Sequence, residues 1–292
     1  MPEYLPSFFV NGVWGKNARV RNDFNGGPLC AKQSTPSVKL SINLCLLPFY
    51  VWGYLVLHNI LHRRMRHRVA LDEVGNPTKI EKAMGYLCLA VLAYNVYLKV
   101  VAETLIFIIN PCHVNCLLLA IISLNKNSLV TEMCALGFFS SNFGGWIGII
   151  FSENEELGML EIVVYYIEHA FASFLGAVVL TYAGRYDIRK YFSFTNIIGG
   201  FLYFTTYMRW LLMPLSAYTW ANLNHTLCGV DNDPFFKHFN LGWTYYFWAD
   251  FYLLFSCWVG WLLNFLIVTA IFKAATMTGL YTEPEPTKHK AK

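Results

Sequence analysis

Seven apolar runs, separated by short charged or turn-rich stretches, constrain this chain more than any other feature. A helix of about 20 apolar residues is long enough to cross the hydrocarbon core of a bilayer. Hydrophobic residues make up 56% of the 292 and charged residues only 14%, whereas a soluble domain carries about 25% charged residues. The sequence therefore predicts an all-α, polytopic membrane helix bundle.

The predicted spans differ in length and polarity. The second is long enough to tilt or bend, the third is short for a full crossing, and polar and glycine residues at 140–145 interrupt the fourth. We expect a transmembrane domain over 38–273, preceded by a segment outside the bilayer at 1–37 and followed by a disordered tail at 274–292. The seven spans cover residues 40–61, 83–109, 110–124, 129–151, 158–183, 193–215 and 241–272.

The distribution of basic residues predicts how the bundle is oriented. With the N-terminus outside or in the lumen, the cytoplasmic segments hold fourteen Lys and Arg, six of them in the loop from His62 to Lys82, and the outer segments hold six. The acidic stretch at 152–156 also falls outside. Because cytoplasmic loops carry the excess of Lys and Arg, this pattern favours a lumenal N-terminus and a cytoplasmic C-terminus.

Other functional classes find no support in the sequence. No basic stripe suggests a nucleic-acid partner. The eight cysteines contain no C-x-x-C pair, which argues against a zinc site or a thioredoxin-like motif. Cys112 and Cys116 share a helical face, but a metal there would need two more ligands from elsewhere, so we expect neither a metal nor another cofactor.

Asn110-Pro111-Cys112-His113 is the stretch with the clearest chemical signature. Asn is a good N-cap and Pro is favoured at the first helical position, which predicts Cys112 in the first turn of a new helix. Unpaired backbone N–H groups and the helix dipole favour a thiolate there and can hold an oxyanion. The alternative is a cysteine that only packs in an apolar helix.

Ionisable residues inside the spans are functional candidates by default. Counting along the spans places several of them in the outer half, at the same depth as Cys112, and places His169 near the middle. This distribution predicts either a polar cavity or a structural network of salt bridges. The outer group comprises Lys99, Glu103, Arg209 and Asp250.

Two histidines are candidate bases for the cysteine. His169 shares a helical face with Glu161 and Tyr165, either of which could orient its ring. Glu168 points about 100° away and is expected to serve the buried lysine or arginine instead. His113 is the rival base, although neighbouring residues on a helix do not face each other.

Several short motifs occur in order between about residues 25 and 240: Asn25-Gly26-Gly27-Pro28 with Cys30, Asn110-Pro111-Cys112-His113-Val114, Glu161-Ile162 leading to Tyr166-Ile167-Glu168-His169, Asn222-Leu223-Asn224, Leu227-Cys228 and Asp233-Pro234-Phe235. On these motifs the chain resembles the transmembrane protein 164 family. That family is regarded as membrane acyltransferases that place polyunsaturated acyl chains on lyso-ether phospholipids. The resemblance implies that Cys112 is the nucleophile and His169 its base, with phospholipid and lysophospholipid as substrates. It is consistent with a multi-pass protein of the endoplasmic reticulum or another internal membrane.

The remaining assignments concern substrate binding and a disulfide. Lys99 or Arg209 could hold the lipid phosphate, and His113 is a third candidate for substrate binding because its backbone N–H can hold the oxyanion. Cys30 and Cys228 both fall outside the membrane in turn-rich segments, where an oxidising compartment favours a disulfide between them; the alternative is two free thiols. A lipid hydrolase with the same nucleophile is an alternative function, and so is a receptor or transporter built from seven helices.

Overall fold

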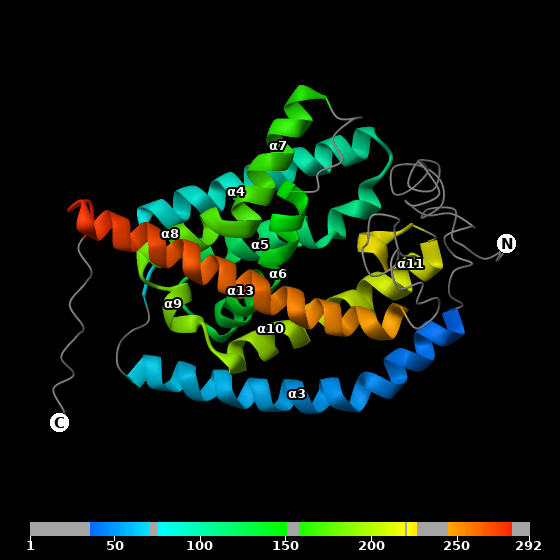
Figure 1. Ribbon diagram of the computed structural model, residues 1–292. Helices are drawn as coiled ribbons and strands as arrows, with labels where there is room; N and C mark the ends of the chain where they lie inside the picture. Colours follow the sequence, from blue (N-terminus) through cyan, green and yellow to red (C-terminus); the bar gives the residue numbers. More distant parts are fainter. Residues whose placement is uncertain (1–35, 71–74, 151–157, 220, 227–244, 282–292) are drawn as a thin grey trace.

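The computed structural model describes residues 36–70, 75–150, 158–219, 221–226 and 245–281 (Figure 1). These residues form helices and their connections, with no β-strand among them. Five helices are long and apolar enough to cross a membrane: Ser37–Arg66, Lys79–Val101, Leu129–Ile150, Met159–Ala183 and Phe251–Met277. The all-α fold is therefore confirmed for the described residues, and the five helices have the length and composition expected of a membrane protein.

The basic run at the end of the first span is helical, contrary to the predicted loop. Helix α3 extends over Pro36–Ala70, so the chain turns only after the run has ended. Arg64 holds this part of the helix to the bundle, because it donates to Asn196 Oδ1 at 3.0 Å and lies over the Tyr191 ring. Basic side chains are good helix formers, and hydropathy alone could not show where the helix stops.

The second predicted span contains a break. Helix α4 covers Lys79–Val101 and starts in a capping box between Thr78 and Glu81. Two residues past its end, Glu103 takes a left-handed φ of 54°, and a 3₁₀ helix, η1, follows at Leu105–Ile109. The break separates α4 from the short helix α5, Pro111–Leu124.

Helix α6, Leu129–Ile150, runs without interruption through the polar and glycine residues at 140–145. The polar side chains find partners inside the bundle; Ser141, for example, donates to Gly137 O at 2.8 Å. The glycines allow a close approach, since a Cβ on Gly145 would lie 2.8 Å from the backbone nitrogen of Ser173. These small residues therefore bring helices together without breaking α6.

Two continuous helices each contain a π turn. The first joins α7, Met159–Ala170, through η2, Phe171–Leu175, to α8, Gly176–Ala183. The second, at the place of the sixth predicted span, joins α10, Phe194–Thr206, through η3, Tyr207–Leu212, to α11, Met213–Thr219. A π turn adds a residue to one turn of an α-helix and often occurs at functional sites.

The remaining described elements are short, apart from the last helix. They are α9, Ile188–Tyr191, and the 3₁₀ helix η4, Leu223–His225. Helix α13 covers Tyr245–Met277, so the last helix ends a few residues beyond the predicted boundary at 273.

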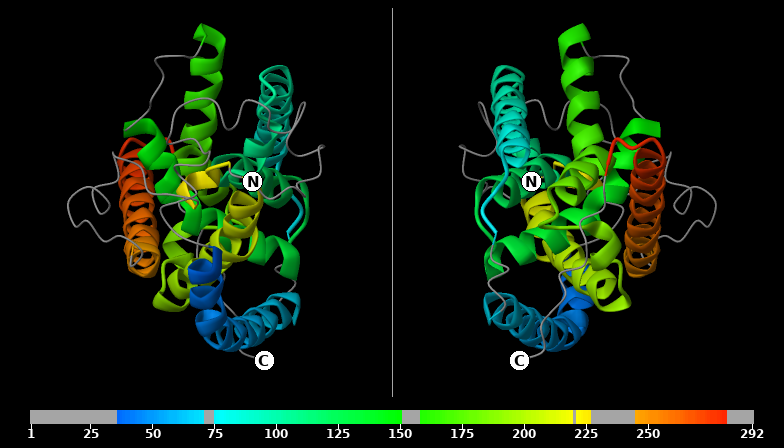
Figure 2. Two further views of the ribbon diagram at one scale, coloured as in Figure 1. Left: turned by 90° about the vertical axis from the view of Figure 1, so that its right-hand side faces the viewer. Right: turned by 90° about the vertical axis from the view of Figure 1, so that its left-hand side faces the viewer.

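The core lies between α5 and α6, which pack against each other near the centre of the bundle. Phe138, Phe139, Leu119 and Ile122 are fully buried there. Helices α10 and α13 cover α6 from other sides, and α3 lies along the edge of the bundle (Figures 1 and 2). Helices α3 and α13 run in the same direction, from the right to the left of Figure 1.

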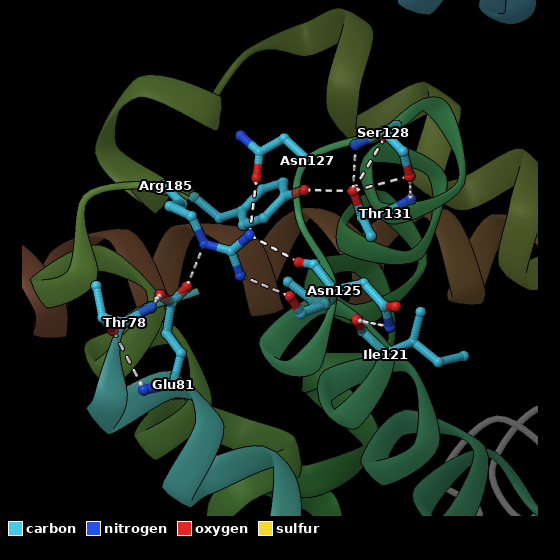
Figure 3. A network of polar contacts seen from close by, with 10 residues as sticks. Thr78, Glu81, Ile121, Asn125, Asn127, Ser128, Thr131 and Arg185 are labelled. Carbon is cyan, nitrogen blue, oxygen red and sulfur yellow. Dashed lines mark hydrogen bonds and ion pairs between the residues drawn. The ribbon is translucent and has the colours of Figure 1, made fainter. Parts of the chain in front are cut away.

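Arg185, just after α8, ties three helix ends together (Figure 3). Its guanidinium donates to Glu81 Oε1 at the start of α4 at 2.8 Å, and to Ile122 O near the end of α5 at 2.7 Å. It also donates to Asn125 O at 2.8 Å and Asn127 Oδ1 at 3.0 Å. Because it caps the last turn of α5 and pairs with a fully buried carboxylate, this side chain fixes α5 against α4.

Candidate functional site

Cys112 lies in the first turn of α5, as predicted. Asn110 is the N-cap residue with extended φ and ψ of −63° and 149°, and Pro111 follows at the first helical position. The Asn110 side chain makes no capping hydrogen bond. Instead, the loop before it is held from η3, where the Tyr207 hydroxyl donates to Ile109 O. The first-turn N–H groups of α5 therefore lie beside the cysteine without a side-chain cap.

Two imidazoles flank this cysteine. The Cys112 sulfur lies within 4.8 Å of a ring nitrogen of His113, and it interacts electrostatically with His113 and His169. The structure thus brings the predicted nucleophile and its predicted base together from α5 and α7. The expectation that neighbouring residues do not face each other is wrong at His113. At the first turn of a helix no earlier turn restricts the side-chain rotamers, so adjacent side chains can meet.

His113 is paired with a buried carboxylate from α7. Its Nδ1 lies 2.5 Å from Glu168 Oε1, and the other carboxylate oxygen accepts from Asn95 Nδ2 of α4 at 3.0 Å. Glu168 is only 2% exposed. Lys99 or Arg209 was the predicted partner of Glu168; its hydrogen bonds go to His113 and Asn95 instead, while Lys99 interacts with it electrostatically. The carboxylate orients the imidazole and balances a charge on it.

His169 has one orientation fixed by its own helix. Its Nδ1 lies 2.8 Å from the backbone carbonyl oxygen of Tyr165, and the His169 ring stacks on the Tyr165 ring with centroids 4.0 Å apart. A carbonyl oxygen only accepts, so Nδ1 carries the proton and the lone pair of the neutral ring is on Nε2. Tyr165 is one of the two residues predicted to orient this ring. The other, Glu161, instead accepts from the backbone nitrogen of Gly158 at the helix start.

Gly148 of α6 closes the other side of the His169 ring. The Tyr165 hydroxyl donates to Gly148 O at 2.9 Å. A Cβ added at Gly148 would lie 2.5 Å from His169 Nε2, well inside van der Waals contact. The absence of a side chain at this position therefore provides the space that the imidazole occupies. Sequence reasoning did not single out Gly148, because glycines in α6 serve several close contacts.

A polar layer lies one turn below the cysteine. Asn115 accepts at Oδ1 from the Ser141 hydroxyl of α6 at 2.6 Å and donates from Nδ2 to Ala172 O of η2 at 3.1 Å. It is almost fully buried. These bonds connect α5 to α6, which borders His169, and to η2, which continues the helix that carries His169. They therefore fix the rotation of α5. The amide three residues after the cysteine was the sequence signal that could have identified it.

The predicted phosphate-binding residues lie in different places. Lys99, in the last turn of α4, interacts electrostatically with Cys112 and Glu168, and its ammonium lies 5.9 Å from the centroid of the Phe107 ring. Among the described residues its ammonium makes no hydrogen bond or ion pair. Arg209, in η3, is buried and donates to Asn43 Oδ1 of α3 at 3.3 Å. Lys99 therefore lies close to the cysteine. The described hydrogen bond of Arg209 is instead with α3.

The cluster also has the donor types of a metal site. Ligand atoms of Cys112, His113 and Glu168 all lie within 4.8 Å of one another. The nitrogen of His113 and the oxygen of Glu168, however, are 2.5 Å apart. Two ligands of a tetrahedral zinc ion would be about 3.4 Å apart. The short separation suits a shared proton better than two ligands of one ion.

Some predicted features fall outside the described residues. These include both members of the predicted disulfide, Cys30 and Cys228, and the side chain of Asp250. The cysteines at 45, 88, 112, 116, 134 and 257 are free thiols. The disulfide therefore stays a prediction.

No family model matches the chain, and no solved structure matches it. Inferences about its activity therefore depend on the side chains around Cys112.

Proposed function

We propose that the protein is a membrane acyltransferase that moves an acyl chain from a phospholipid to a lysophospholipid through a thioester on Cys112. The observation that carries the proposal is a thiol at a helix start that interacts with two imidazoles, one of which is paired with a buried carboxylate. This is the arrangement of an activated nucleophile. The resemblance to the transmembrane protein 164 family supports the same chemistry.

The proposed topology has seven crossings, with a lumenal N-terminus and a cytoplasmic C-terminus. Five long apolar helices account for most of them. Helix α5 and the continuous helix at 194–219 supply the other two; the second contains Arg209 and is less apolar than the five. The parallel course of α3 and α13 supports an odd number of crossings (Figure 1). We also propose that the protein lies in the endoplasmic reticulum or another internal membrane.

Acylation begins with the transfer of a proton. His169 Nε2 accepts the thiol proton of Cys112, because Nδ1 already donates to the backbone of its own helix. The sulfur attacks the ester carbonyl carbon of the donor lipid. The C–O bond breaks, and the departing glycerol oxygen takes the proton from His169. The products are a thioester on the sulfur and a released lysophospholipid.

Deacylation repeats these steps in reverse with a second lipid. The hydroxyl of the acceptor lysophospholipid gives its proton to His169 and attacks the thioester carbonyl. The C–S bond breaks, and the thiolate regains the proton from His169. In both steps, first-turn N–H groups of α5 can hold the oxyanion, and each such donor contributes roughly 3 kcal/mol in well-studied enzymes.

The other groups around the thiol have supporting roles. His113, held by Glu168, places positive charge beside the sulfur and favours the thiolate. Lys99 is a cation close to the same cluster, which suits it to the phosphate of a bound lipid. A nucleophile with two imidazoles and a carboxylate has no use in a simple receptor, so this cluster favours an enzyme.

The test is acyl transfer by purified full-length protein in lipid nanodiscs. A donor phospholipid with an isotope-labelled acyl chain is incubated with a lysophospholipid, and mass spectrometry follows the labelled chain. Cys112→Ser should lose at least 99% of the transfer, while Cys45→Ser, at an exposed free cysteine of α3, should keep it. A labelled acyl group on the Cys112 peptide that hydroxylamine releases would identify the thioester.

Two outcomes would contradict the proposal. Full transfer by Cys112→Ser would mean that this cysteine only packs in the helix. Labelled free fatty acid, at the same rate with and without lysophospholipid, would mean that water is the acceptor and the protein is a lipid hydrolase.

A further inference from the structure

A second apolar site lies between α3 and the rest of the bundle, away from the cysteine. A cavity of about 510 Å³ is lined by eight side chains of α3 between Leu47 and Leu61 and is closed by Met133, Thr206 and Trp210. Cavities that bind small molecules have volumes of about 300–1,000 Å³. The lining surface is almost wholly apolar. The part of a ligand that lies in this site is therefore a hydrocarbon.

The cavity is long and follows one helix. Its lining extends from Leu47 to Leu61 of α3. Fourteen helical steps of 1.5 Å make a length of about 21 Å. The hydrocarbon part of one membrane leaflet is about 15 Å thick, so an acyl chain that crosses one leaflet is no longer than the cavity. An extended acyl chain fits these dimensions, whereas a compact apolar ligand would leave most of the length empty.

The face of α3 that borders the cavity continues into the basic run at the end of the helix. Along α3 the exposed positions Val51, Leu55 and His58 continue one turn at a time to His62 and Arg66. The His58 and His62 rings stack with centroids 5.8 Å apart. An apolar groove that ends in exposed histidine and arginine side chains matches a phospholipid with an anionic head group.

The continuous helix formed by the end of α10 and by η3 separates this groove from the cysteine. Thr206 and Trp210 line the groove. Tyr207, on another face of the same helix, donates to Ile109 O in the loop that leads to Cys112. A lipid in the groove would thus contact the helix that borders the candidate site without reaching the nucleophile.

We propose that the groove along α3 is a binding site for a resident anionic phospholipid. One acyl chain lies against the apolar side chains from Leu47 to Leu61, and the phosphate lies beside His62 and Arg66. This site is distinct from the acyl-transfer site and takes a lipid that is not consumed.

The test uses phospholipids that carry a photoactivatable diazirine at the end of one acyl chain. Phosphatidylserine and phosphatidylcholine forms of the probe are incorporated separately into nanodiscs with the purified full-length protein. After irradiation, peptide mass spectrometry locates the adducts. We expect the serine lipid to label the peptides that contain Leu47–Leu61 and Trp210 at least fivefold more than the choline lipid does.

Three variants probe the two halves of the site. The double substitution His62→Glu and Arg66→Glu should remove the preference for the serine lipid. Val51→Trp, at the exposed edge, should fill the groove and reduce its labelling at least fivefold. Arg63→Glu is the matched control, because Arg63 is exposed but points about 100° from His62 around the helix. Size-exclusion chromatography checks that each variant is folded.

Equal labelling by the two lipids, or adducts spread evenly over all lipid-facing helices, would overturn the proposal, since ordinary annular lipid behaves in that way. Cys112→Ser should label as the wild type does. Groove labelling that persists in a protein without acyl transfer would support the lipid site even if the proposed function is wrong.

Discussion

The substitution Gly148→Ala tests the geometry of the proposed base most directly. The added methyl group would lie 2.1 Å from His169 Cδ2 and 2.5 Å from Nε2, whereas ordinary van der Waals contact begins at 3.4 Å. The ring must therefore move by about 1.3 Å. It cannot do so freely, because the Tyr165 carbonyl holds Nδ1 and the Tyr165 ring stacks on it. A misplacement of about 1 Å can lower a rate about 10²-fold, which is about 2.7 kcal/mol of activation free energy.

Two measurements check this effect. The first is the acyl-transfer rate in nanodiscs, which should fall about 10²-fold. The second is the rate at which iodoacetamide alkylates the Cys112 peptide, which should also fall because the displaced imidazole no longer takes the thiol proton. The alkylation rate does not depend on the identity of the lipid substrate.

Gly144→Ala is the matched control on the same helix. A Cβ at Gly144 meets nothing within 4 Å, and Ala is a better helix former than Gly. This variant should keep both rates. Overpacking at Gly148 also destabilises a core by about 1–3 kcal/mol, so thermal unfolding must show that the variant is folded at the assay temperature. A folded Gly148→Ala variant with wild-type rates would refute the assignment of His169 as the base.

Three further substitutions test the contacts around the site. Arg185→Lys should lower the thermal unfolding midpoint, because one ammonium cannot serve Glu81 and the three other acceptors together, and each buried partner left unpaired costs about 1–3 kcal/mol; an unchanged midpoint would contradict this role. Glu168→Gln should lower the alkylation rate of the nucleophilic thiol at least tenfold by removing the charge beside His113, and a wild-type rate would show that the pair is only structural. Trp261→Phe removes an indole N–H that donates to a buried serine hydroxyl of α6 at 3.0 Å and leaves space at a fully buried position, so its free energy of unfolding should fall by at least about 1 kcal/mol without any change in alkylation.

The sequence allows the start of α5 to be predicted because the signal is local. Asn110 and Pro111 specify an N-cap and a first helical position, and the structure has both. The end of the first helix could not be predicted in the same way. The basic residues after Leu61 favour a helix as well as a cytoplasmic loop, and the contact of Arg64 with Asn196 that keeps them on the bundle joins distant parts of the chain.

The pairing of His113 with Glu168 illustrates why the site was only partly predictable. Helical spacing correctly separates Glu168 from the face of His169, but it does not show which helix that carboxylate meets. The answer depends on the rotation of α7 against α5, which Asn115 fixes through contacts with α6 and η2. The break at Glu103 could not be predicted for another reason: no glycine or proline at this position signals a left-handed backbone.

Because a π turn follows His169, the position of this side chain depends on the number of residues in that turn. Residues Phe171–Leu175 form a wider turn, so α7 and α8 follow one axis with their faces offset from those of a regular helix. Deleting one residue there would restore the α-helical repeat and rotate His169 by about 100° relative to the buried face of α8. Related chains that share this chemistry should therefore tolerate substitutions in the segment but conserve the number of residues in it.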